Sequence, residues 1–95
     1  MKEIISNEEL KKIYEKGQGF VYNDYTPYSK YGKQFNKLHK ANSTCMDPSN
    51  QNRMKVEGIE KKHTKYFFDT YDEAIAWLKQ NRSQVGYSNC GLCFR

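Results

Sequence analysis

The chain has few aliphatic side chains and no long apolar run. Among its 95 residues are four leucines and three valines, and no stretch of 18 apolar residues exists, so we expect no membrane-spanning helix. Met1 to Ile5 lead directly into charged, helix-favouring sequence without the apolar segment of a secretory signal. The sequence therefore predicts a cytoplasmic protein that does not associate with membranes.

Cysteine is also scarce, and the three that occur are an odd number. Disulfide frameworks need paired cysteines and an oxidising compartment, and a chain without an export signal is expected to stay in a reducing one. A disulfide with one spare thiol remains an alternative, but the pattern favours reduced thiols. Such thiols are available as metal ligands.

Aromatic and basic residues are what the chain has in quantity. Aromatic residues make up 15% of it, including eight tyrosines, and 16 Lys and Arg against 11 Asp and Glu give a net charge of +5. The isoelectric point near 9.1 excludes an acidic mimic of DNA and permits a nucleic acid or an acidic protein surface as partner. A mean hydropathy of −1.01 indicates a small core, and small domains of this kind commonly depend on a metal, disulfides or a second subunit.

The order of patterns predicts one α+β domain over residues 1–95, with two helices and a short antiparallel sheet. Ser6 with Glu9 and Thr70 with Glu73 have the spacing of capping boxes, which open helices. Residue composition separates the remaining segments into strands and loops. The expected elements are a helix at about 7–16, a strand at 19–22, a tyrosine-rich loop at 23–32, a strand at 33–40, a loop at 41–52, a weak strand at 54–60, a strand at 65–68 and a helix at 71–82.

Four residues have the types and spacing of a zinc site. They are His39, Cys45, Cys90 and Cys93, written H-x5-C in the middle of the chain and C-G-L-C at its end. A CxxC turn directs two thiolates at one ion, and a second pair completes the tetrahedral sphere of three sulfurs and one nitrogen that Zn²⁺ favours. The sequence therefore predicts zinc as the cofactor, in a unit that spans residues 36–93.

Other interpretations of these residues stay open. His63 is an alternative fourth ligand, although the lysines around it disfavour a dication, and Asp47 is a weaker one. A redox CxxC needs a helix after it to lower a thiol pKa, and only Phe94 and Arg95 follow here. Four protein ligands leave no position for a catalytic water, and no His-x-Glu motif is present, so we expect a structural site and no enzyme.

The order of motifs from Leu38-His39 and Cys45 through Tyr66-Phe67-Phe68 and Tyr71–Ala74 to Cys90-Gly91-Leu92-Cys93 resembles a known class. It is similar to small bacterial zinc modules, among them the metal-binding domain of alkylated-DNA repair proteins, over about residues 36–93. That family has four cysteines with a C-x3-C first pair where this chain has H-x5-C, and the difference argues against methyl-acceptor chemistry. The resemblance implies a zinc-stabilised α+β unit linked to DNA.

Basic and aromatic residues also alternate between positions 25 and 40. Lysines neutralise phosphates and exposed tyrosines stack on bases, which predicts a nucleic-acid surface. An equally weighted interpretation is that the lysines solvate the domain while the tyrosines fill its core. The expected nucleic-acid or partner surface consists of Tyr25, Tyr28, Lys30, Tyr31, Lys33, Lys37 and Lys40, with a second basic group at Arg53, Lys55, Lys61, Lys62 and Lys65.

Two functions follow from these patterns. The first is a zinc-stabilised nucleic-acid-binding module associated with DNA. The second is a stand-alone protein-interaction or inhibitor factor of phage or mobile-element origin, which would bind its partner through the tyrosine-rich loop. Binding to nucleic acid separates the two.

Overall fold

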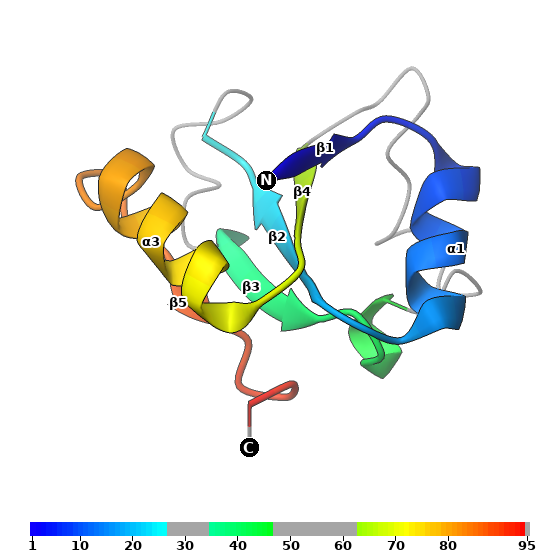
Figure 1. Cartoon of the computed structure of the whole chain (residues 1–95). Helices are drawn as coiled ribbons and strands as arrows, with labels where there is room; N and C mark the ends of the chain where they lie inside the picture. Colours follow the sequence, from blue (N-terminus) through cyan, green and yellow to red (C-terminus); the bar gives the residue numbers. More distant parts are fainter. Residues whose placement is uncertain (27–34, 47–62, 95) are drawn as a thin grey trace.

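Five strands form one mixed sheet in the computed structural model, which describes residues 1–26, 35–46 and 63–94 (Figure 1). The strand order across the sheet is β1-β4-β2-β3-β5. The first three pairings are antiparallel, and β5 pairs with β3 in parallel. The strands span Lys2–Ile4 (β1), Phe20–Asp24 (β2), Lys37–Lys40 (β3), Thr64–Phe68 (β4) and Ser88–Asn89 (β5).

Two helices begin at the capping residues that the sequence predicts. In α1 (Asn7–Lys16) the Ser6 hydroxyl accepts a hydrogen bond from the Glu9 N–H, and in α3 (Tyr71–Asn81) the Thr70 hydroxyl accepts one from the Glu73 N–H. Gly17 ends α1 in the left-handed conformation, which glycine adopts without steric cost. Local sequence thus determines both helix starts and one helix end.

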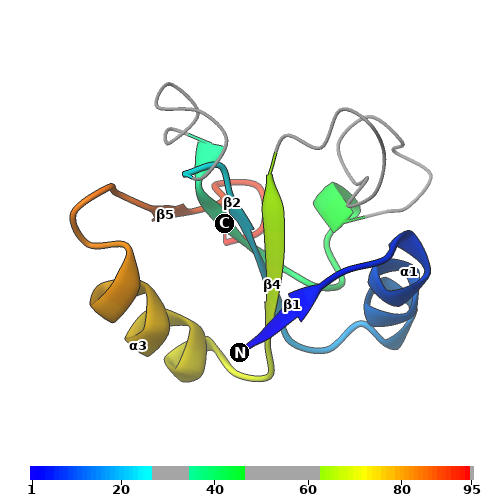
Figure 2. The ribbon, with the colours of Figure 1, turned by 90° about the horizontal axis from the view of Figure 1, so that it is seen from above.

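The two helices cover opposite faces of the sheet (Figure 2). Successive strand residues point to opposite faces, so Val21 joins the core beneath α1 while Tyr22 joins the core beneath α3. Leu10 is the buried residue of α1, and Ala74 and Leu78 are those of α3. We call the two sides the α1 face and the α3 face.

Two further contacts hold the central strand β2 in place. Gly19, just before β2, has a φ of 94°, and a Cβ there would lie 2.6 Å from the Phe67 ring, so only glycine fits. At the other end of β2, the buried Asp24 carboxylate accepts a hydrogen bond of 2.8 Å from Arg82, which follows α3.

None of the described helices has the length and apolar composition that a membrane span requires.

The predicted α+β class with two helices and a short sheet is confirmed over the described residues, but the sheet is mixed rather than antiparallel as expected, because β5 pairs with β3 in parallel. The other differences lie at the sheet edges. The strands β1 and β5, which have only three and two residues, were not predicted. Residues 23 and 24, expected in a loop, belong to β2, and within the described residues the strand expected at 33–40 begins only at Lys37, as β3. The weak strand at 54–60 and most of the tyrosine-rich loop lie outside the described residues.

Candidate metal centre

The structure brings together the four residues that the sequence selects as metal ligands. One ligand atom from each of His39, Cys45, Cys90 and Cys93 lies within 4.8 Å of all the others. His39 comes from β3, Cys45 from the 3-10 turn η2 (Thr44–Met46), and the last two from the turn after β5. The cluster can therefore hold a metal ion.

Strand pairing explains how residues so distant in sequence come together. In the parallel register of β5 on β3, Leu38 pairs with Asn89, and the Cys90 N–H donates to the Leu38 carbonyl over 2.9 Å. Cys90 therefore arrives beside His39, the next residue of β3. The chain then turns back on itself, because the N–H groups of Cys93 and Phe94 both donate to the Cys90 carbonyl.

The second pair is brought together by local chain geometry. After β3 the Ser43 N–H donates to the Lys40 carbonyl and the Met46 N–H donates to the Ser43 carbonyl, so the chain folds into the tight turn η2. This turn directs Cys45 back toward the end of β3, where its sulfur is buried. The five residues between His39 and Cys45 are thus the end of β3 and the turn that leads into η2.

Two separations between ligand atoms match a tetrahedral zinc sphere, and all four ligand atoms lie within 4.8 Å of one another. Zn–S bonds of about 2.3 Å and a Zn–N bond of about 2.0–2.1 Å at tetrahedral angles place two sulfurs about 3.8 Å apart, and a sulfur and a nitrogen about 3.6 Å apart. The Sγ atoms of Cys45 and Cys90 are 3.9 Å apart, and Sγ of Cys93 lies 3.5 Å from Nδ1 of His39. A disulfide would need about 2.05 Å, and all three cysteines are free.

The His39 ring is in the state that a metal ligand requires. Burial, and then the positive charges of Lys65 and Lys37, lower its pKa to about 4. The imidazole is therefore neutral at physiological pH and keeps a lone pair for a metal. Its Nδ1 faces Cys93, while its Nε2 faces the Asn23 side chain.

The thiols ionise with different ease. Burial opposes ionisation of Cys90, but hydrogen bonds from the backbone N–H groups of Cys93 and Leu92 and from the thiols of Cys93 and Cys45 together outweigh that effect and lower its pKa. Burial raises the pKa of Cys93 to about 11. Because a bound cation stabilises thiolates, an ion would favour ionisation of Cys93 more than that of Cys90.

Ser43 supports two ligands from its place at the start of the turn. Its hydroxyl oxygen lies 3.0 Å from Sγ of Cys93 and accepts a hydrogen bond from the Cys45 N–H over 3.1 Å. A hydroxyl that can rotate can donate to a Cys93 thiolate instead. Ser43 was not predicted as part of the site, because a serine in a polar loop does not by itself indicate a contact with a metal ligand.

The alternative fourth ligand lies elsewhere. His63 is buried with its ring stacked on that of Tyr25, with 4.9 Å between centroids, and it does not belong to the cluster. Asp47 lies outside the described residues. Among the residues that the structure describes, His39 is therefore the histidine that joins the three cysteines.

Only part of the expected nucleic-acid surface can be located. Tyr28, Lys30, Tyr31 and Lys33 lie outside the described residues. Lys37 is hydrogen-bonded through Nζ to the Ser88 hydroxyl, and Lys40 lies with Nζ 5.3 Å from the centre of the Phe94 ring. Tyr25 is half-buried and its ring contacts those of Phe35 and His63.

Lys65 differs most from the expectation. The sequence analysis placed it in a surface group of basic residues, whereas its side chain is wholly buried and bonded to Asn23 over 2.6 Å. The other four members of that group lie outside the described residues. The alternation of β4 accounts for the error, because Lys65 and Phe67 share the α1 face that a surface lysine would avoid.

No family model matches the chain, and no curated protein or solved structure was found to be significantly similar to it. Function therefore has to be inferred from the chemistry of the site and its surroundings.

Proposed function

We propose that the chain is a zinc-stabilised nucleic-acid-binding module in which His39, Cys45, Cys90 and Cys93 hold one structural Zn²⁺. The single observation that carries the metal part is the set of ligand-atom separations, 3.9 Å between two sulfurs and 3.5 Å from sulfur to nitrogen. Three soft sulfurs with one imidazole suit zinc better than the hard cations calcium and magnesium, which prefer oxygen.

The role of the ion in this proposal is structural. Four protein ligands fill a tetrahedral sphere and leave no position for a reacting water. The ion would join the C-terminal turn to β3 and η2, and so close the chain between residues 39 and 93. Zinc sites of this kind supply folding free energy directly in small modules. We accordingly propose that the protein is not an enzyme.

The nucleic-acid part rests on charge and on one group of side chains. Beyond the net charge of +5, the rings of Phe20, Tyr71 and Phe94 contact one another with centroids 5.7–6.1 Å apart, and Lys40 lies over Phe94. We call Phe20, Lys40, Tyr71 and Phe94 the basic–aromatic patch. A cation beside rings is the combination that binds single strands, through phosphate neutralisation and base stacking.

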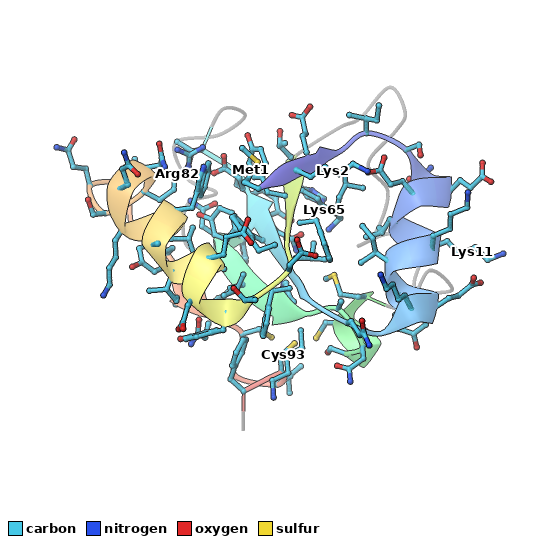
Figure 3. The ribbon with its side chains drawn as sticks, viewed as in Figure 1. Met1, Lys2, Lys11, Lys65, Arg82 and Cys93 are labelled. Carbon is cyan, nitrogen blue, oxygen red and sulfur yellow. The ribbon has the colours of Figure 1, made fainter. Side chains whose placement is uncertain are left out.

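Electrophoretic mobility shift with single- and double-stranded DNA and RNA at two salt concentrations tests this part. Neutralising Lys37 and Lys40 together (K37Q/K40Q) should weaken binding and reduce its salt dependence by roughly one slope unit for each lost phosphate contact. The matched control is K11Q/K12Q, which removes the same charge from two exposed lysines of α1 (Figure 3 labels Lys11). The control should bind nearly as the natural sequence does.

Two results would count against nucleic acid as the partner. Equal weakening by both double variants would mean that net charge acts without a defined surface. A natural sequence that shifts no nucleic acid even at low salt would contradict the proposal and leave the protein-interaction factor as the function to pursue.

A further inference from the structure

A chain of buried polar side chains lies directly behind the His39 ring. Asn23 Nδ2 is 3.2 Å from His39 Nε2, and Lys65 Nζ donates to Asn23 Oδ1 over 2.6 Å. Lys65 is wholly buried, and Asn23 and His39 are exposed by only 7% and 8%. Lys65 lies on the side of the sheet toward α1 (Figure 3). Burying such groups costs free energy unless they are hydrogen-bonded to one another, as these are.

The strand register explains why these three residues meet. Asn23 is on β2, the central strand, and lies directly opposite Lys65 of β4. On its other side Asn23 pairs with Lys37 of β3, so His39, two residues further along, is its diagonal neighbour on the same face. The chain Lys65–Asn23–His39 thus crosses three adjacent strands and ends at the candidate metal centre.

The lysine fixes the orientation of the Asn23 amide. A protonated lysine only donates hydrogen bonds, so the atom facing it is the carbonyl oxygen and the NH₂ group faces the histidine. Asn23 therefore donates to Nε2 of His39, which must present its lone pair. In a neutral imidazole the proton is then on Nδ1, the atom that faces Cys93.

When a metal binds, His39 needs a hydrogen-bond acceptor from Asn23 instead of a donor. A cation bound at Nδ1 displaces the proton there, and the neutral ring then carries its proton on Nε2. This N–H requires an acceptor, and metal-bound histidines usually donate to a carbonyl or carboxylate. The NH₂ group of Asn23 cannot accept.

We propose that Asn23 is a positioning residue of the metal centre, which holds His39 with Nδ1 toward the sulfurs and whose side-chain amide turns over on metal binding, so that Oδ1 accepts a hydrogen bond from Nε2. This inference rests on the proposed zinc site. The turned amide directs its NH₂ group at Lys65. The turned amide therefore requires Lys65 in its neutral form, which its complete burial favours and which can accept this hydrogen bond, whereas the protonated form donates to Oδ1 in the metal-free arrangement.

Nitrogen-15 NMR of the zinc-loaded natural sequence tests the inference without any substitution. We expect His39 to show a metal-bound Nδ1 and a protonated Nε2 whose hydrogen exchanges slowly with water. A metal bound at Nε2, or an Nε2–H that exchanges as fast as an exposed one, would overturn the proposal.

Zinc affinity of Asn23 variants, measured by competition with a chromophoric chelator, provides the second test. Asn23→Asp supplies an acceptor whichever way the group turns, and it should bind zinc as tightly as the natural sequence or several-fold more tightly. The double variant N23L/K65M removes the chain without leaving a buried amine unpaired, and it should bind zinc about 10- to 100-fold more weakly. If this double variant does not fold, the NMR measurement still decides.

Leu78→Ala is the control for stability alone, because Leu78 is buried on the α3 face, away from the metal centre. It should leave the zinc affinity within a few-fold of the natural value. Equal affinities for the natural sequence, Asn23→Asp and N23L/K65M would overturn the role of Asn23 while leaving the zinc site intact. A natural sequence that binds no zinc would instead refute the zinc site, and the role of Asn23 with it.

Discussion

The two faces of the sheet are built in different ways. The α3 face is a core of apolar and aromatic side chains, in which Tyr22, Leu38, Phe68 and Leu78 are fully buried and the Trp77 ring contacts three other aromatic rings. The α1 face contains aliphatic residues too, but it also buries the metal cluster and the Asn23–Lys65 pair. Burial of apolar area stabilises most of the α3 face, which also buries the Asp24–Arg82 ion pair. The α1 face instead buries thiols, an imidazole and an amine, which must be ligated or hydrogen-bonded.

This difference indicates where the stability of the domain comes from. The α3 face buries mostly apolar side chains together with one ion pair, Asp24 with Arg82, so most of its stability comes from burial of apolar area. Part of the buried area of the α1 face consists of thiols and an imidazole, which contribute most to the stability of the fold when they bind an ion. We therefore expect the two faces to respond differently to chelation, substitution and pH.

The largest effect should come from the metal ligands. Cys90→Ala removes one of the four ligands and should cost several kcal/mol, because structural zinc contributes on the order of 10 kcal/mol in small modules. Urea unfolding with and without a strong chelator measures this. The chelator should destabilise the natural sequence and have little further effect on Cys90→Ala. An equal effect on both would mean that no ion holds this face.

A smaller effect should follow from truncation on the α3 face. Leu78→Ala should lower the free energy of unfolding by about 2–5 kcal/mol through loss of burial and formation of a cavity. Ile75, which the sequence places on the same helix face, is only half-buried, so Ile75→Ala should cost less. Thermal unfolding of both zinc-loaded variants measures the difference. A larger loss of stability for Ile75→Ala than for Leu78→Ala would contradict the assignment of Leu78 to the buried side of α3.

The pH dependence of stability should reveal the buried lysine of the α1 face. Burial lowers the pKa of Lys65 from 10.5 to about 7. The unfolded chain therefore binds this proton more readily, and the folded state loses stability as the pH falls from 10.5 through 7. Relative to Lys65→Met, the zinc-loaded natural sequence should gain about 2 kcal/mol between pH 7 and pH 9.

Lys79→Met is the control for this measurement, since it removes a positive charge from the exposed surface of α3. It reports how much of any change comes from charge alone. A natural sequence and a Lys65→Met variant with parallel pH profiles would mean that Lys65 is not buried in solution.

The smallest effects should come from the helix caps, one for each face. Ser6→Ala and Thr70→Ala each remove a side-chain acceptor at a helix start, and each should cost about 1 kcal/mol. Urea unfolding of the zinc-loaded proteins measures both. Similar losses of stability would show that capping contributes equally to both helices. The two faces would then differ only in the side chains buried between helix and sheet. A cost near zero at Ser6 would instead mean that α1 is held by packing alone.

Much of the fold was predictable because its signals are local. Both helices begin where Ser6 and Thr70 predict, and the aromatic strand at 65–68 is β4 with one residue added. The two-residue strand β5 could not be found, because its pairing with β3 depends on contacts more than fifty residues apart along the chain. Strands this short lack a periodic pattern.

The four metal ligands could be predicted from the sequence, whereas the residues that contact them could not. CxxC and H-x5-C are short patterns and can be recognised without knowledge of the fold. Asn23, Ser43 and Lys65 reach the site only through strand register and a turn. Lys65 in particular looks like any surface lysine until β4 is paired between β1 and β2.

The central claim is that one ion holds the α1 face together through four named side chains. Native mass spectrometry of the purified protein, prepared without added metal or chelator, tests it most directly. We predict one zinc per chain in the natural sequence and none in the variant with Cys90→Ala and Cys93→Ala combined. A natural sequence that is folded and free of metal, with all three thiols reduced, would contradict it.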